Sequence, residues 1–239
     1  MLLTDRVAVV TGAAMGIGRA VAEGLARFGA RVAACDRAAE ELSTLDAPVK
    51  AVFDVRDGDA VREFAAGLDR VDILVNNAGG TFRAPFLDVS AGGQQAIVDE
   101  NFTSVTHFVR ACAPLMTNGG SIVNVTSIEA HRAGPGFAVY SAMKAAVENL
   151  TKSLALELAD RAIRVNCVAP DDIPTPGVGE LAVRTPLPDQ GHVDDVAGAA
   201  VFLASDLSRF VTGTTIHVDG GNWAAGGWYR DDSGGFRVR

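Results

Sequence analysis

Residues 6–18 read RVAVVTGAAMGIG, a short apolar run followed directly by a glycine-rich turn. The run at residues 6–11 is rich in β-branched side chains, which is typical of a strand buried in a parallel sheet. The turn at residues 12–18 has the spacing Gly-x3-Gly-x-Gly, and an amphipathic stretch after it predicts a helix to about Phe28. A strand, a glycine-rich turn and a helix in this order predict the start of an α/β fold.

Apolar runs and helical patterns alternate along the rest of the chain. Predicted strands cover residues 31–36, 49–54, 72–76, 121–126, 162–168 and 214–218. Predicted helices cover residues 93–117, 139–160 and 193–204, and a proline-rich loop covers residues 170–188. This alternation predicts a doubly wound, Rossmann-like parallel sheet in one domain, residues 1–221, followed by a tail at residues 222–239. In such folds ligands bind at the carboxyl ends of the strands.

Composition narrows the classes of partner. The chain has 239 residues, 48% of them hydrophobic, and a net charge of -8, which disfavours nucleic acid or an anionic membrane as a partner. No apolar stretch is long enough to span a membrane, and Asp5 and Arg6 interrupt the apolar N-terminus, so we expect no signal peptide. Cys35, Cys112 and Cys167 lie in apolar segments, which predicts buried thiols in a reducing cytoplasm and neither a disulfide framework nor a metal site.

The glycine-rich turn has two interpretations, a tight turn alone or a phosphate-binding loop. Its place between a strand and a helix favours the second, because glycines let the backbone approach a pyrophosphate at the helix N-terminus. Asp36 ends the second predicted strand, where a carboxylate can accept hydrogen bonds from a ribose diol and repel a 2′-phosphate. We therefore predict NAD(H) as the cofactor. Arg37 could instead bind that phosphate, so NADP(H) is the alternative.

Tyr140 and Lys144 lie four residues apart on a predicted helix and so share a face. Ser127 follows the end of a predicted strand shortly before them. A nearby ammonium lowers the pKa of a tyrosine from about 10, which would let the phenol exchange a proton during carbonyl and alcohol interconversion. Such a pair alone is usually a surface accident, but the serine and the glycine-rich turn favour a site.

Taken together, these motifs resemble the short-chain dehydrogenase/reductase superfamily, in its single-domain branch, over nearly the whole chain. They are residues 11–18, Asn76-Asn-Ala-Gly79, Asn101, Ser127, Tyr140-x3-Lys144 and Asn166-Cys-Val-Ala-Pro170. The resemblance implies that Tyr140 is the general acid in reduction and the base in oxidation. It implies that Lys144 lowers the pKa of Tyr140 and holds the nicotinamide ribose, that Ser127 binds the substrate oxygen, and that Asn101 positions a water.

The resemblance also implies a cofactor site at the strand ends and in the loop after the sixth strand. Its members are Gly12, Met15, Gly16, Ile17, Gly18, Asp36, Arg37, Asp54, Val55, Asn77, Ala78, Gly79, Tyr140, Lys144, Pro170, Ile173 and Thr175. The chain departs from the family where Pro170 is followed by Asp171 and Asp172, since relatives commonly have Pro-Gly there. Two carboxylates near a pyrophosphate would be unfavourable unless they point away or find hydrogen-bond donors.

Loop residues beside the expected site are candidates for substrate contact, or else form an ordinary rim. They are Thr81, Phe82, Glu129, His131, Arg132 and Phe137. The remaining loop, residues 177–191, is short for a substrate lid and predicts a rather open or modest-sized pocket.

We expect an oxidoreductase that transfers a hydride between NAD(H) and a small secondary alcohol or ketone. Polyol or sugar dehydrogenation falls within that class, as does tailoring of a secondary metabolite. One alternative is a 3-oxoacyl-thioester reductase using NADP(H), and another is a non-catalytic, dinucleotide-sensing binding protein. Epimerase or dehydratase chemistry on nucleotide sugars usually adds a larger C-terminal region than this chain has.

We expect a homotetramer, or a homodimer, built partly from the helices that carry Asn101 and Tyr140. Four aromatic residues lie in the tail: Trp223, Trp228, Tyr229 and Phe236. A glycine-rich tail could be disordered, but exposed aromatics favour docking on a neighbouring subunit near its active site.

Overall fold

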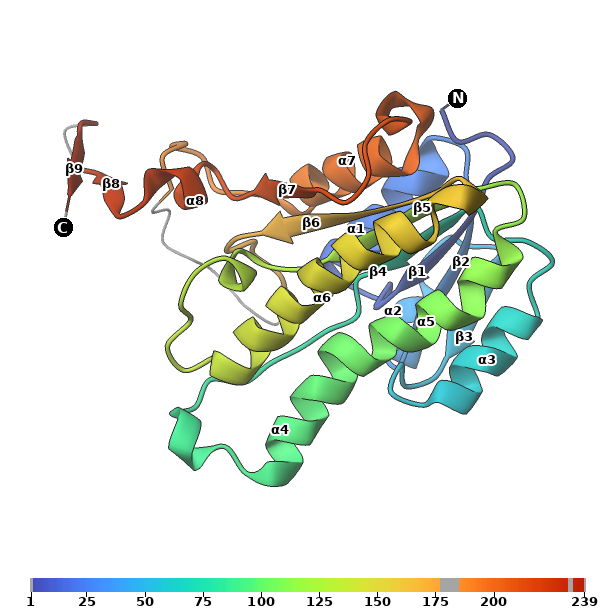
Figure 1. Cartoon of the computed structure of the whole chain (residues 1–239), viewed down its shortest axis with the longest axis horizontal. Coiled ribbons are helices and arrows are strands. Elements are labelled where there is room, and N and C mark those ends of the chain that lie inside the picture. Colours follow the sequence, from blue (N-terminus) through green and yellow to red (C-terminus); the bar gives the residue numbers. More distant parts are fainter. Residues whose placement is uncertain (1, 177–184, 232–233, 239) are drawn as a thin grey trace.

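A computed structural model describes residues 2–176, 185–231 and 234–238. In these residues, seven parallel strands form one sheet with the order β3-β2-β1-β4-β5-β6-β7 (Figure 1). The strands are β1 (Val7–Thr11), β2 (Arg31–Asp36), β3 (Val49–Val52), β4 (Ile73–Asn76), β5 (Gly120–Val125), β6 (Ile163–Pro170) and β7 (Thr215–Val218). The chain reverses its direction across the sheet between β1 and β4, so the predicted doubly wound fold is confirmed.

Helices cover both faces of the sheet, with a separate apolar core on each side. On one face lie α1 (Gly16–Arg27), α2 (Ala39–Ser43) and α7 (Val193–Ala204), and on the other lie α3 (Gly58–Ala66), α5 (Ser104–Cys112) and α6 (Ala138–Glu157). The strand β1 serves both cores, because Val10 packs with the α1 side and its neighbour Val9 packs with the α5 side. This alternation follows from the two-residue period of a strand.

The long helix predicted at residues 93–117 is interrupted. It consists of α4 (Ala91–Val98), a π-helical turn η2 (Asp99–Thr103), α5 and a short 3-10 turn η3 (Ala113–Leu115). It begins earlier than predicted because the Ser90 Oγ caps α4, accepting a hydrogen bond from the Gly93 N–H at 3.1 Å. Single π turns inside helices are frequent at functional sites, and this turn contains Asn101.

Several short helices and turns were not predicted from the sequence. The helices α2 and α3 were not predicted, although the Asp57 side chain caps α3 by accepting hydrogen bonds from two backbone N–H groups. Further 3-10 turns lie at η1 (Phe86–Asp88), η4 (Ile128–Ala130), η5 (Ala159–Arg161) and η6 (Asp206–Ser208). The strand β6 extends to Pro170, two residues further than predicted, whereas β3 ends at Val52.

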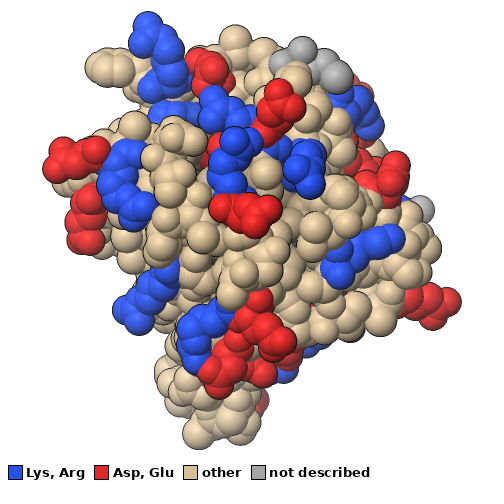
Figure 2. Space-filling model, turned by 90° about the vertical axis from the view of Figure 1, so that its right-hand side faces the viewer, with Lys and Arg blue, Asp and Glu red and all other residues tan. Residues whose placement is uncertain are grey.

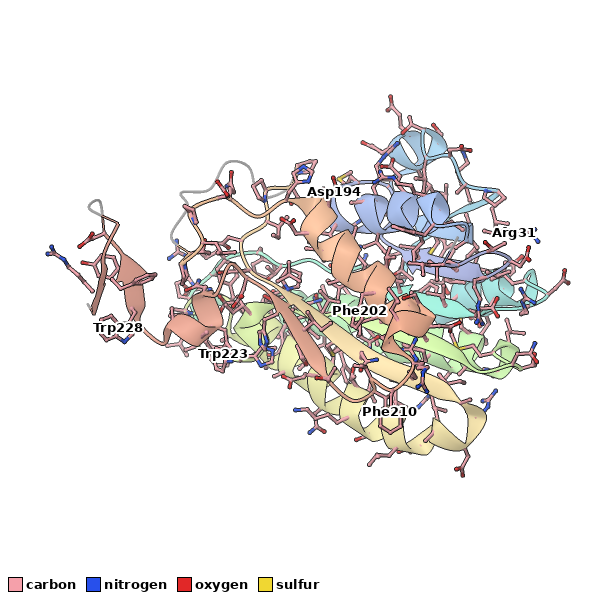
Figure 3. The ribbon with its side chains drawn as sticks, turned by 90° about the horizontal axis from the view of Figure 1, so that it is seen from above. Arg31, Asp194, Phe202, Phe210, Trp223 and Trp228 are labelled. Carbon is pink, nitrogen blue, oxygen red and sulfur yellow. The ribbon has the colours of Figure 1, made fainter. Side chains whose placement is uncertain are left out.

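The C-terminal tail leaves the body of the molecule. It forms a short helix, α8 (Asn222–Ala225), and a hairpin of β8 (Trp228–Arg230) and β9 (Phe236–Val238), which lies apart from the sheet (Figures 1 and 3). Trp223 packs at the body, with its ring near His131 and stacked on His217. Half of Trp228 is exposed, at 52%.

Other predictions concern the surface and the loops. Positive and negative side chains interleave across the face seen in Figure 2 rather than gathering by sign. The three cysteines are buried and free, as predicted. No helix among the described residues is both long and apolar enough to cross a bilayer. Much of the loop expected to leave an open pocket, residues 177–184, lies outside the described residues.

Candidate active site

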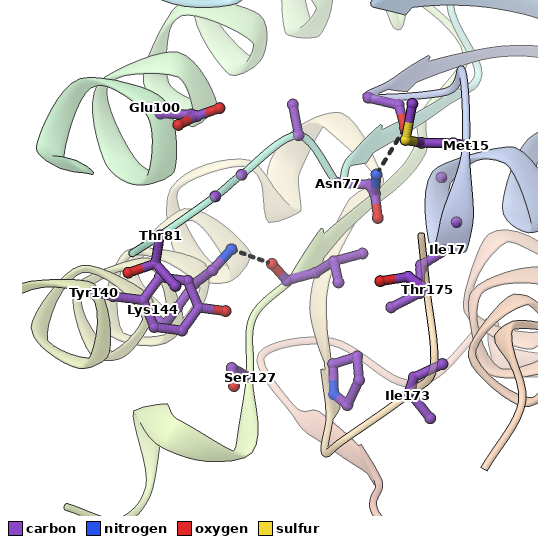
Figure 4. Close-up of a pocket in the computed structure, with 18 of the residues that line it drawn as sticks. Met15, Ile17, Asn77, Thr81, Glu100, Ser127, Tyr140, Lys144, Ile173 and Thr175 are labelled. Atoms are coloured by element: carbon purple, nitrogen blue, oxygen red, sulfur yellow. Dashed lines mark hydrogen bonds between the residues drawn. The ribbon is translucent and has the colours of Figure 1, made fainter. Parts of the chain in front are cut away.

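A cavity of about 760 Å³ opens at the carboxyl ends of the strands. It runs from the end of β2 past the glycine-rich turn to the first turns of α6 (Figure 4). Every residue that the sequence predicted for the dinucleotide lines this cavity, and so does Ser127. The position agrees with the general rule that such sheets bind ligands where the strand order reverses.

The glycine-rich turn is fixed to the end of β4 by hydrogen bonds. The Thr11 Oγ1 accepts hydrogen bonds from the N–H groups of Asn77 (3.0 Å) and Ala78 (2.9 Å). In return, the Asn77 Nδ2 donates to the carbonyl oxygens of Thr11 and Gly12, both at 3.1 Å. A side chain at Gly18 would collide with the Gly12 carbonyl oxygen and the Asn77 amide, so this close approach requires glycine.

The N-terminus of α1 points into the cavity without a side chain to satisfy its amides. Met15 occupies the capping position and makes no side-chain hydrogen bond, and the first turn has no acidic residue. Free N–H groups at a helix start and the helix dipole together attract an anion. The turn therefore fits the pyrophosphate of a dinucleotide.

Asp36 and Arg37 lie at the adenosine end of the cavity. The Asp36 carboxylate accepts hydrogen bonds from the N–H groups of Ala14 (2.9 Å) and Ala38 (3.0 Å), which hold it at the cavity wall. Arg37 is 64% exposed and its nearest charged partner is Glu100, at 3.8 Å. The Asp36 carboxylate is thus held by two backbone amides, whereas the Arg37 guanidinium is largely exposed.

Tyr140, Lys144 and Ser127 meet on the opposite wall (Figure 4). Tyr140 and Lys144 come from successive turns of α6, and the Lys144 Nζ lies 5.5 Å from the centre of the tyrosine ring. Lys144 is buried and donates a hydrogen bond to the Val125 carbonyl oxygen at 3.0 Å. Ser127 follows the end of β5. The end of this strand and the start of α6 therefore bring a hydroxyl, a phenol and an ammonium together.

The pKa of Tyr140 differs from the sequence prediction. Burial of the phenol raises it, a hydrogen bond with Ser127 lowers it, and the charge of Glu129 raises it, with a net increase. Lys144 is not among these causes, so the protein alone does not have the lowered Tyr140 pKa that the Lys144 spacing predicted. Burial also lowers the pKa of Lys144 to about 8, so the ammonium is itself destabilised by the same dry surroundings.

Asn101 lies behind Lys144 rather than on the cavity wall. It is fully buried, and its Nδ2 donates to the carbonyl oxygens of Gly80 (2.8 Å) and Ile97 (2.9 Å). Its Oδ1 makes no hydrogen bond within the described residues. A Cβ at Gly79 would lie 2.8 Å from this oxygen and 3.1 Å from the Lys144 Nζ, so both polar atoms face one small space that glycine leaves open.

The predicted substrate residues divide into two groups. Thr81, Glu129 and Phe137 line the cavity. Phe82 does not, and it borders a minor hollow instead. His131 does not either, because it is turned toward Glu148, whose Oε2 lies 3.3 Å from its Nδ1, and toward the ring of His217.

Carboxylates at the cavity were missed or left unassigned by the sequence prediction. Asp171, Asp172 and Glu100 all line it. Of the two carboxylates that depart from the family pattern, Asp171 finds donors, because Arg132 (3.2 Å) and the Asn222 Nδ2 (2.6 Å) donate to its two oxygens. Arg132 also contacts Glu129, at 2.9 Å. These residues lie far apart along the chain, so no local sequence pattern predicted their hydrogen-bond network.

The sheet order and the cavity define a Rossmann-like, dinucleotide-binding protein. A family model described as enoyl-(acyl carrier protein) reductase matches residues 12–222. The 3-oxoacyl-[acyl-carrier-protein] reductase of Thermotoga maritima is 38% identical over 243 residues, covering 92% of this chain and 99% of that protein.

Solved structures of similar proteins support the same family. The gluconate 5-dehydrogenase of Burkholderia cenocepacia, in complex with NADP and tartrate, has a TM-score of 0.87 and 37% identity, covering 93% of this chain and 97% of that one. The carveol dehydrogenase of Mycobacterium avium, in complex with NAD, has a TM-score of 0.86 and 32% identity, covering 93% and 99%. The chain therefore belongs to the short-chain dehydrogenase/reductase superfamily, oxidoreductases that interconvert CH–OH and carbonyl groups with NAD(P).

Proposed function

We propose that this protein oxidises a secondary alcohol, or reduces the corresponding ketone, with NAD(H). One observation supports this most strongly: Tyr140, Ser127 and Lys144 share a single cavity with the whole predicted dinucleotide site. A bound nicotinamide would supply the hydride acceptor or donor. The chain's own residues would bind the substrate and move its proton.

We propose the following roles for the residues at the reacting end. Ser127 and Tyr140 hold the substrate oxygen, where negative charge develops as the carbonyl is reduced. Tyr140 gives its proton to that oxygen in reduction and takes it back in oxidation. The oxidised nicotinamide ring carries a positive charge, and its binding beside the phenol would lower the pKa of Tyr140 toward the working range.

Lys144 and Asn101 would support this proton transfer. Lys144 would hold the nicotinamide ribose. The unpartnered Oδ1 of Asn101 and the Lys144 Nζ face one space beside Gly79, which suits a water that carries the proton onward.

The cofactor preference rests on Asp36. Its carboxylate is held at the cavity wall by two backbone amides, where it would accept hydrogen bonds from the ribose diol and repel a 2′-phosphate. A second candidate is a 3-oxoacyl-thioester reductase using NADP(H). The relative from Thermotoga maritima favours it by its activity, and exposed Arg37 offers a partner for the phosphate.

A spectrophotometric panel separates these candidates. Absorbance of the reduced nicotinamide is followed with NAD(H) and NADP(H), against secondary alcohols, polyols, ketones and a 3-oxoacyl thioester. We expect the highest kcat/KM for an alcohol or ketone with NAD(H). A preference for the thioester with NADP(H) would select the second candidate, and cofactor binding without any turnover would favour a dinucleotide sensor.

We propose a cytoplasmic homotetramer or homodimer. Large apolar side chains on two neighbouring elements support assembly: Leu156 of α6 is 80% exposed, and Phe210, after η6, is 95% exposed. The three free, buried thiols are consistent with a reducing compartment. Sedimentation velocity gives the assembly directly, and a monomer at micromolar concentration would contradict the proposal.

We also propose that the tail docks on a neighbouring subunit near its active site. A two-stranded hairpin is marginally stable in water by itself, and this one carries an exposed Trp228 apart from the body. Deletion of residues 223–239 should weaken assembly or raise the substrate KM. Trp228→Ala is the milder test, because it leaves the packing of Trp223 on His217 intact. If neither variant changes assembly or KM, the tail docks nowhere.

A further inference from the structure

The substrate end of the cavity carries an excess of negative charge. Among the described residues, Glu129, Asp171 and Asp172 line the cavity. Glu129 contacts Ser127 through its N–H, and Arg132 links Glu129 to Asp171. Among the described lining residues, the basic ones are Arg37, at the adenosine end, and Lys144, which is buried behind the tyrosine. Neither lies among the three carboxylates.

Arg132 does not reverse this charge, because its guanidinium is shared by two of the carboxylates. It donates to the Glu129 Oε1 from Nε (3.1 Å) and from NH2 (2.9 Å), and to the Asp171 Oδ1 at 3.2 Å. Three carboxylates thus face one guanidinium, which is already engaged and is 34% exposed. A substrate anion would have to compete with both of its partners.

One carboxylate oxygen still needs a donor. The Glu129 Oε2 is buried and has no hydrogen-bond partner in the described part of the chain. Glu129 as a residue lies beside the reacting groups, since its N–H donates to the Ser127 Oγ at 3.2 Å and its charge acts on Tyr140. The Oε2 atom lies against Gly134 and the Ser141 Oγ, so a ligand in the cavity would meet the negative charge of Glu129 rather than this atom. That charge favours a neutral or cationic ligand over an anion.

We propose that this cavity discriminates against carboxylate and phosphate substrates and favours alcohols and ketones that are neutral or carry an ammonium group. This inference rests on the proposed function and names its substrate class. The solved relative is named for gluconate and holds tartrate, and both carry a carboxylate, so the two proteins would differ in substrate charge. In a partly dry cavity, like charges a few ångströms apart lower affinity by about 10- to 100-fold.

A matched set of alcohols tests the proposal. 3-Hydroxybutyrate, 1,3-butanediol and 4-amino-2-butanol share the reacting carbon and differ in carrying a carboxylate, a hydroxyl or an ammonium. For the dinucleotide-loaded protein, kcat/KM and the ligand-induced shift in Tm are measured for each. We expect the diol and the amine to exceed the carboxylate by about 10-fold or more in kcat/KM. Equal or better use of the carboxylate would overturn the proposal.

Variants that remove one negative charge show which carboxylates cause the preference against anionic substrates. Glu129→Gln and Asp172→Asn should each narrow the preference against the carboxylate by about 3- to 10-fold. No hydrogen bond of the Asp172 side chain appears in the described residues, so its variant keeps the Arg132 network intact. Glu157→Gln, at the far end of α6, removes the same charge and should change nothing. If both cavity variants behave like Glu157→Gln, the proposal is wrong.

The binding measurement separates this inference from the proposed function. If no alcohol or ketone is turned over but the Tm shifts follow the predicted order, the enzymatic proposal fails and the charge selectivity stands. If turnover is found and favours carboxylates, the enzymatic proposal stands and the charge selectivity fails.

Discussion

The two ends of the cavity are built differently. At the cofactor end the hydrogen bonds each have a backbone group as one partner: the Asn77 amide donates to two carbonyl oxygens, and the Asp36 carboxylate accepts from two N–H groups. At the substrate end the hydrogen bonds are made by charged and polar side chains from three separate segments: Glu129 and Arg132, Asp171, and Asn222. The first arrangement tolerates few substitutions, because backbone atoms cannot rotate out of the way as a side chain can. The second can change its charge with single substitutions.

This difference explains how one fold serves many substrates. A nicotinamide dinucleotide is common to the family, so the backbone that holds it is set by steric limits on residues such as Gly18. The substrates named for the relatives differ, and the carboxylates that we propose face the substrate lie in loops. Loops that carry function on a rigid scaffold follow the same division.

The largest expected effect lies where the two ends meet. Tyr140→Phe should lower kcat by about 10²- to 10⁴-fold, because the proton donor is lost while the ring remains. Binding of the dinucleotide should persist, since the backbone of the cofactor end is untouched. Steady-state kinetics and a fluorescence titration of the reduced cofactor measure the two effects. A variant that keeps most of its kcat would place the chemistry elsewhere.

A methyl group at Gly18 should damage the cofactor end selectively. Gly18→Ala drives the new carbon into the Gly12 carbonyl oxygen and the Asn77 amide, at a cost of about 1–3 kcal/mol. We expect a lower Tm and a dinucleotide Kd raised by about 10-fold or more. Gly198→Ala in α7, where a Cβ meets nothing within 4 Å, is the control and should leave Kd unchanged. Equal Kd values for the two variants would contradict a sterically fixed turn.

The cofactor preference should respond to a single charge. Asp36→Asn keeps a side-chain oxygen that can accept one of the two backbone hydrogen bonds but loses its repulsion of a 2′-phosphate. The ratio of kcat/KM for NAD(H) over NADP(H) should fall by about 10-fold. A wild-type ratio that already favours NADP(H) would refute the NAD(H) assignment before any variant is made.

The smallest effect links the two ends through Tyr140. The charge of Glu129 raises the pKa of this phenol, so Glu129→Gln should lower that pKa. Alcohol oxidation needs the deprotonated phenol and rises with pH, so the rising limb of kcat/KM should move to lower pH. The profile of Glu157→Gln should overlay that of the wild type. A limb that stays in place or moves upward would show that Glu129 does not act on Tyr140.

The sequence predicted most where backbone geometry repeats. The sheet follows from apolar runs that alternate with helical patterns, and the glycine-rich turn marks where its first strand meets a helix. The residues expected at the dinucleotide came mostly from the family resemblance, and all of them line the cavity. The four-residue spacing of Tyr140 and Lys144 correctly placed them on one helix face.

It predicted less where distant segments meet. The Arg132–Asp171 pair joins residues 39 positions apart, and the Asp171–Asn222 hydrogen bond joins residues 51 apart, so neither leaves a local pattern. His131 is close to Ser127 in sequence but turns toward Glu148 instead of the cavity. The direction of the Tyr140 pKa shift was missed because burial and Glu129, which depend on the tertiary fold, outweigh what spacing alone suggests.

A structure of the protein with NAD(H) and an unreactive ketone or alcohol analogue tests the central claim most directly. We predict that the dinucleotide spans the cavity from Asp36 to Lys144, with the analogue's oxygen within hydrogen-bond distance of both the Tyr140 hydroxyl and the Ser127 Oγ. An analogue whose oxygen lies away from both hydroxyls, with the dinucleotide in place, would contradict the proposed chemistry.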